Sequence, residues 1–113
     1  GFCATCHSQF HAESIGLLAF LRHPSDFVIP NKGEYAEYTI YELTAPVARS
    51  IIEEEPSDQV YPGRDLVMCL SCHVAHASPF DGMLRFDFRK MVAGRAGDAA
   101  GTGCFACHSR KGR

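Results

Sequence analysis

The sequence has no long apolar run and little lysine, and each shortage excludes a class of protein. Its longest apolar run covers residues 15–21, is interrupted by Gly16 and stops at Arg22, well short of the roughly 20 residues that a membrane-spanning helix needs. Lysine occurs only at positions 32, 90 and 111, and the formal net charge is −2. Nucleic-acid binding needs a basic stripe that neutralises phosphates. We therefore expect neither a membrane span nor a nucleic-acid partner.

Targeting and linker segments are missing as well. Gly1 and Phe2 lead directly into Cys3, so we expect an exported protein to be present here as its mature chain or as a fragment. No low-complexity segment divides the 113 residues, a length that fits one domain. Hydrophobic residues make up 46% and charged residues 21%, which excludes disorder as the default. The expected organisation is one domain over residues 1–113.

Every cysteine lies in one repeated pattern. The pentapeptides CATCH, CLSCH and CFACH contain Cys3, Cys6, Cys69, Cys72, Cys104 and Cys107. Two thiols separated by two residues reach the two vinyl groups on one edge of a porphyrin, and the histidine that follows lies under the ring and binds its iron. Disulfides give no reason for a histidine after each second cysteine, and zinc needs four ligands, into which three identical units do not divide. The pattern predicts three covalently bound heme c groups.

The remaining histidines match the number of irons. The motifs contain His7, His73 and His108 as proximal ligands, which leaves His11, His23 and His76 as candidate distal ligands. We expect bis-histidine ligation of all three irons, with Met68, Met83 and Met91 as the competing axial ligands. A histidine–methionine pair raises the potential, so bis-histidine irons are expected at low potential. Because six-coordinate irons have no open position for a substrate, the pattern favours electron transfer over catalysis.

The second half of the chain resembles the doubled-CxxCH family of multiheme cytochromes. The resemblance is carried by CLSCHVAH at residues 69–76, SPFDGMLRF at 78–86 and CFACH at 104–108, while LRHP at 21–24 is similar to a distal-ligand motif of relatives in metal-respiring bacteria. It implies crossed ligation, in which His76 binds the iron of the heme on Cys104 and Cys107. His76 lies only three residues after His73, too near to reach the opposite face of its own heme.

The other two distal ligands are less constrained. His11 follows His7 by four residues, about one helical turn, so we expect it to bind another heme, most simply the second. His23 would then bind the first heme, although the reverse assignment, with His23 on the second heme, stays open.

The expected fold is mostly α with much irregular structure, organised around the hemes. Apolar spacing and prolines predict helices over residues 12–22 and, after a start at Thr44 and Pro46, over residues 47–55. Tyr35, Tyr38 and Tyr41 recur at a spacing of three and are expected mainly in the core. Residues 84–88 alternate like a short strand or form a turn over a heme, and residues 94–103 are expected to form a loop before the third motif.

These observations predict an electron-transfer cytochrome and not an enzyme. Covalent heme attachment takes place outside the cytoplasm, so we expect a periplasmic or extracellular protein. Its expected partners are other redox proteins or extracellular electron acceptors. Two alternatives stay open: a protomer of a conductive heme filament, in which the chain self-associates head to tail, and a fragment of a heme enzyme with an open iron site.

Overall fold

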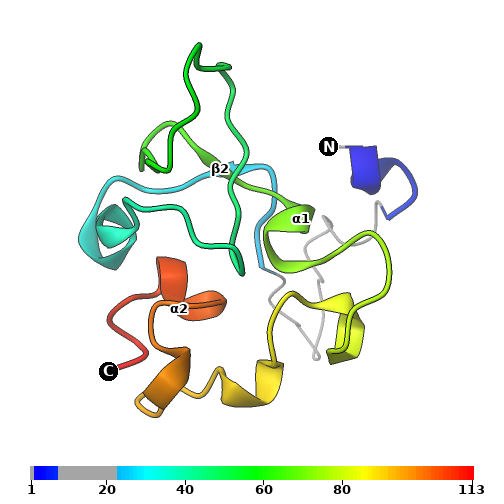
Figure 1. Cartoon of the computed structure of the whole chain (residues 1–113), viewed down its shortest axis with the longest axis vertical. Coiled ribbons are helices and arrows are strands. Elements are labelled where there is room, and N and C mark those ends of the chain that lie inside the picture. The colour runs from blue at the N-terminus through cyan, green and yellow to red at the C-terminus, as the bar shows by residue number, and fades with distance from the viewer. Residues whose placement is uncertain (1, 8–22) are drawn as a thin grey trace, which may run out of the picture.

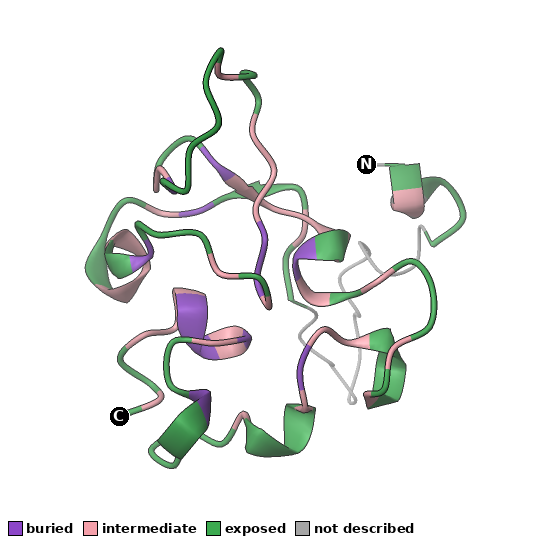
Figure 2. Ribbon diagram, viewed as in Figure 1, coloured by how far each residue is buried: buried purple, intermediate pink, exposed green. Residues whose placement is uncertain are grey.

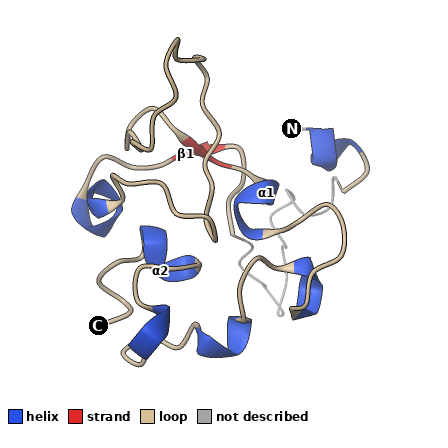
Figure 3. Cartoon of the chain, in the orientation of Figure 1, coloured by secondary structure: helices blue, strands red, loops and turns tan. Residues whose placement is uncertain are grey.

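Single turns of helix and long irregular segments make up most of the computed structural model (Figures 1 and 3). The structure describes residues 2–7 and 23–113, so the predicted helix over residues 12–22 lies outside the described residues. The helices are the 3-10 turns η1 (Phe2–Thr5), η3 (Gly33–Glu37), η4 (Asp81–Met83), η5 (Phe88–Lys90) and η6 (Gly97–Ala99), and the α-helical turns α1 (Cys69–Cys72) and α2 (Cys104–Cys107). The expected abundance of irregular structure is confirmed, and no helix among the described residues is long and apolar enough to cross a membrane.

One two-stranded antiparallel sheet links the segment that follows residue 23 to the second CXXCH motif. Strand β1 (Phe27–Val28) pairs with β2 (Leu66–Val67), with Phe27 opposite Val67 and Val28 opposite Leu66. Because α1 begins two residues after β2 ends, this pairing places the segment that follows residue 23 next to the second motif (Figure 1).

The predicted helix over residues 47–55 is wrong. Ala48 forms an antiparallel bridge with Leu66, in which each residue's N–H donates to the other's carbonyl, at 2.9 and 2.8 Å. A helix would need those same backbone groups for bonds within the segment, and the long-range pairing takes them. The loop after residue 50 instead projects from the molecule, where Ile51 and Ile52 are exposed (Figures 1 and 2).

The Arg49 guanidinium holds the base of this projecting loop. It donates to the Glu53 carboxylate at 2.6 Å and to the Gln59 carbonyl, and it lies 3.7 Å from the carboxylate of Asp65. Asp65 is buried, and it also accepts from the backbone N–H of Tyr61 at 2.9 Å. A buried carboxylate is tolerated when it is paired in this way.

The polypeptide core combines the motif-free middle of the chain with the third motif. Its buried residues are Ile29, Tyr38, Ala45, Val60 and Ala106. Tyr38 confirms the expectation that the regularly spaced tyrosines pack in the core, whereas Tyr41 is 42% exposed. Ala106 lies inside α2, so the middle of the chain packs directly against the third CXXCH turn (Figure 2).

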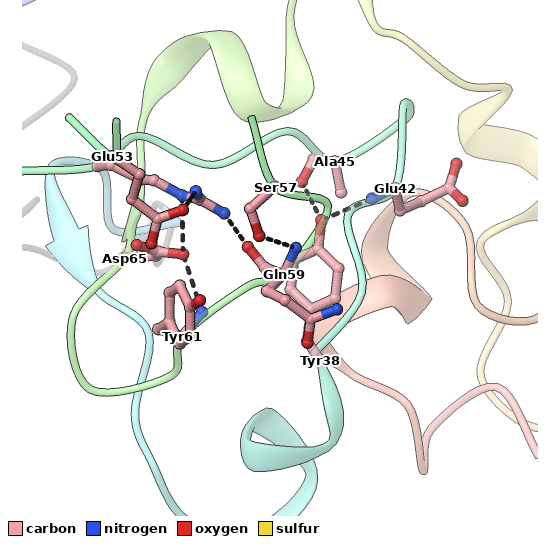
Figure 4. Close-up of polar contacts among 9 residues, drawn as sticks. Tyr38, Glu42, Ala45, Glu53, Ser57, Gln59, Tyr61 and Asp65 are labelled. Atoms are coloured by element: carbon pink, nitrogen blue, oxygen red, sulfur yellow. Dashed lines mark hydrogen bonds and ion pairs between the residues drawn. The ribbon is translucent and has the colours of Figure 1, made fainter. Parts of the chain in front are cut away.

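The Tyr38 hydroxyl ties two backbone segments together inside this core. It donates to the carbonyl of Ala45 at 2.7 Å and accepts from the N–H of Glu42 at 3.2 Å (Figure 4). Burial, the largest contribution, raises the pKa of Tyr38 to about 12, so the hydroxyl keeps its proton at neutral pH and donates.

Tyr38→Phe should therefore lower the free energy of unfolding of the heme-loaded protein by about 1–3 kcal/mol, because a buried carbonyl and a backbone N–H lose their partner. The control is Tyr41→Phe at an exposed position, expected within about 0.5 kcal/mol of the parent protein. Denaturant titration of both variants is the measurement, and equal stabilities would show that the Tyr38 hydroxyl adds nothing.

Candidate heme-binding sites

The three CXXCH motifs share one backbone hydrogen bond. In each, the N–H of the histidine donates to the carbonyl of the first cysteine: His7 to Cys3 at 3.0 Å, His73 to Cys69 at 3.0 Å, and His108 to Cys104 at 2.9 Å. This bond closes a single helical turn, which brings both sulfurs and the imidazole to one short segment. The same bond therefore closes a turn at all three places, a 3-10 turn at the first motif and an α-helical turn at the other two. The third motif also contributes Ala106 to the core.

A hairpin supports the second motif. The Ser71 hydroxyl, buried within α1, accepts from the N–H of Met68 at 3.0 Å. Arg85 reaches back across the hairpin, with its N–H on the carbonyl of Cys72 at 2.8 Å and its guanidinium on the carbonyl of Leu70 at 2.7 Å. These bonds satisfy carbonyls that the end of a one-turn helix leaves without partners.

A glycine sets the start of the third motif. Gly103 is buried, has φ of +52° and donates its N–H to the Thr44 hydroxyl at 2.7 Å. A Cβ at this position would lie 2.8 Å from the ring of Phe86 and 3.0 Å from the sulfur of Met91. The backbone conformation and the close packing both require glycine here.

The cysteine sulfurs of the second and third motifs are partly buried and near one another. Burial, with a smaller effect of neighbouring thiols, raises the pKa of Cys72 and of Cys107 to about 11, and burial also raises the pKa of Cys104. Cys72 is close enough to both cysteines of the third motif to affect these pKa values. Such desolvated positions suit a neutral sulfur, and a thioether to heme is neutral. Among the described residues, which include all six cysteines, none forms a disulfide.

Apolar clefts adjoin the same two motifs. One cleft lies beside the loop after the second motif and is lined in part by Val74, Phe80 and Leu84. Another lies before the third motif and is lined by apolar residues such as Phe86 and Met91 and by charged residues such as Asp87 and Lys90. Apolar surface next to a CXXCH turn is what a porphyrin face needs, so the residues present fit heme.

In three histidines, a hydrogen bond at Nδ1 fixes the orientation of the imidazole ring. The Nδ1 of His73 lies 2.8 Å from the carbonyl of Gly82, that of His108 lies 3.2 Å from a carboxylate oxygen of Glu34, and that of His23 lies 2.9 Å from the carbonyl of Pro24. Each partner is an acceptor, so Nδ1 donates to it and Nε2 is left as the nitrogen that can bind a metal. This is the tautomer that binds a metal through Nε2.

The structure brings together two histidines that the sequence analysis assigned to different hemes. The ring centroids of His23 and His108 are 6.2 Å apart and the ring planes are at 89°. Sequence reasoning expected His23 on the first or second heme and His76 opposite His108. His76 is exposed on the loop after the second motif, His7 is exposed next to η1, and His11 lies outside the described residues. The ligand roles of all six histidines stay predictions.

Glu34 and Glu37 are site residues that sequence reasoning missed. Both belong to η3 and contact the segment after the third motif: Glu34 meets His108 and the N–H of Arg110, and Glu37 meets Ser109 and the guanidinium of Arg110. The pKa of Glu34 is lowered: burial acts upward, but the hydrogen bonds from His108 and Arg110 outweigh it. No local pattern marks these carboxylates, because 74 positions separate Glu34 from His108.

Comparison with known families identifies the second half of the chain. Residues 63–113 match the model of the doubled CXXCH motif. The match covers the second and third CXXCH motifs and leaves the first motif outside it. The match supports a multiheme c-type cytochrome that binds heme c covalently and takes part in electron transfer. No curated protein and no solved structure matches the chain significantly.

Gly103→Ala should lower the stability of the heme-loaded cytochrome more than Gly101→Ala does. Both glycines have positive φ, but a Cβ at Gly101 would have no atom within 4 Å, whereas at Gly103 it collides with Phe86. The shared backbone cost is about 1–2 kcal/mol, and overpacking adds about 1–3 kcal/mol at Gly103 alone. Thermal unfolding of both variants measures the difference, and equal losses would rule out the steric explanation.

Proposed function

We propose that the chain is a triheme c-type cytochrome that transfers electrons outside the cytoplasm. The observation that carries this proposal is the common hydrogen-bonded turn of the three CXXCH motifs. The family match covers the second and third motifs, and the turn at Cys3–His7 has the same histidine-to-cysteine bond, at 3.0 Å. This shared hydrogen bond supports a third heme at Cys3 and Cys6.

The roles of the side chains follow from their chemistry. Each pair of cysteines forms two thioethers with one heme, and each motif histidine is its proximal ligand. When bound, heme iron supplies one-electron redox chemistry. His11, His23 and His76 provide the distal imidazoles, so each iron has two strong-field ligands and no open position. Such a protein carries electrons and does not bind a substrate at iron.

The place of heme attachment supports the proposed location, and the net charge supports the proposed partners. Covalent heme attachment takes place outside the cytoplasm, which favours a periplasmic or extracellular protein. The net charge is −2 before the heme propionates are counted, and these make the loaded protein more acidic. Its partners are therefore redox proteins or extracellular acceptors that do not depend on a lysine-rich docking patch on this chain.

The heme-loaded protein, denatured and measured by intact mass spectrometry, should have the mass of the polypeptide plus three hemes, because thioether bonds survive unfolding. The variant in which Ser replaces both Cys3 and Cys6 should keep two hemes and lose one. A parent protein at the bare polypeptide mass would contradict the cytochrome function, and one with two hemes would contradict the role of the first motif.

Spectra of the same preparation test the ligation. All three ferric irons should be low-spin, and carbon monoxide should leave the reduced spectrum unchanged because no coordination position is open. A high-spin fraction or a carbon monoxide adduct would show an open iron and favour an enzyme.

A further inference from the structure

We infer that His23 and His108 are the two axial ligands of one iron, that of the heme on Cys104 and Cys107. This inference rests on the proposed function and deepens it, because it assigns a ligand pair within the three-heme arrangement. It differs from the pairing implied by the family resemblance, in which His76 occupies that position.

The separation of the two rings carries the assignment. Histidine nitrogens bind metals at about 2.0–2.1 Å, so two axial nitrogens on opposite sides of one iron are about 4 Å apart and their ring centres about 6 Å apart. The observed separation of 6.2 Å between the centroids of His23 and His108 fits this value. An edge-to-face ring pair has a similar spacing, so the assignment also rests on which nitrogen of each ring is left to bind iron.

The hydrogen bonds of both rings favour the iron. Nδ1 of His23 is bonded to the carbonyl of Pro24 and Nδ1 of His108 to Glu34, which leaves a lone pair on the Nε2 of each ring. His23 is exposed, so the burial of apolar surface does not explain why its ring lies beside His108. Two imidazoles fixed at this spacing, each with Nε2 left for iron, fit an axial pair.

The fold holds the two histidines in place from both sides. Four residues after His23, β1 pairs with β2, and Ile29 then enters the core beside Ala106 of α2. The segment that carries His23 is thus anchored to the helical turn that carries His108. No comparable contact is seen between His76 and the third motif in the described part of the chain.

Two matched substitutions test the pairing in the heme-loaded protein. In His23→Met, the heme on Cys104 and Cys107 should move to higher potential, because methionine in place of histidine raises the potential, and the other two hemes should be unchanged. In His76→Met, the third heme should be unchanged. Heme-resolved proton NMR, with each heme assigned through contacts between its thioether protons and its own cysteines, gives the readout.

A change on the first or second heme in His23→Met, or on the third heme in His76→Met, would overturn the pairing and leave the three-heme function intact. The unmodified protein provides a second measurement in case a variant fails to assemble. Nuclear Overhauser contacts should join the His23 ring to the heme on Cys104 and Cys107, and contacts to another heme would overturn the pairing. Failure of the proposed function would show separately, as fewer than three hemes in the parent protein.

A different contact leads to a second inference: we propose that Glu34 is a positioning residue that lowers the potential of the same heme through His108. A carboxylate oxygen of Glu34 lies 3.2 Å from Nδ1 of His108, and the N–H of Arg110 holds the other oxygen at 3.2 Å. An anionic acceptor on Nδ1 makes the imidazole more basic and favours ferric over ferrous iron. His73 has only the neutral carbonyl of Gly82 at the equivalent nitrogen.

Glu34→Gln keeps the size and an acceptor but removes the charge. The preference of the third heme for ferric over ferrous iron should fall about tenfold. For a one-electron couple this raises its reduction potential by about 59 mV. Glu37→Gln is the matched control, since Glu37 bonds to Ser109 and Arg110 but not to His108. Heme-resolved redox titration is the measurement, and an unchanged third heme in Glu34→Gln, or an equal rise in Glu37→Gln, would overturn the role of Glu34.

Discussion

The backbone hydrogen bond from histidine to the first cysteine sets the geometry on which each heme site depends. It closes one helical turn and so fixes the two sulfurs and the imidazole relative to each other within five residues. Everything else in the fold arranges these turns relative to one another. The bond at the first motif has the length seen at the second, 3.0 Å.

Sequence reasoning was most informative where the chemistry is local. An attachment motif needs only five adjacent residues, so the amino-acid sequence alone identifies all three motifs together with their histidines. The helix predicted over residues 47–55 failed because Ala48 pairs with Leu66, a tertiary contact that overrides local helix signals. The contact of His23 with His108 and that of Glu34 with His108 also join distant positions, and no periodicity in the sequence indicates them.

The sequence predicts a fold organised around the hemes, and the polypeptide also contributes a core of its own. That core comes mostly from the motif-free residues between the first and second motifs, and Ala106 connects it to the third. The long motif-free stretch therefore has a structural purpose: it surrounds the third motif and brings η3 against the residues that follow it. The first motif lies away from this unit, on the far side of α1 from α2 (Figure 1).

The contact between η3 and the segment after the third motif has a consequence for the order of folding. It joins positions 74 apart, from Glu34 to His108, and contacts of such long range are slow to form because a large loop must close first. During synthesis, Ile29, Tyr38, Ala45 and Val60 emerge before Ala106. The core is therefore incomplete until residues close to the end of this sequence have left the ribosome. We therefore expect the third motif to stay accessible until the core closes around Ala106.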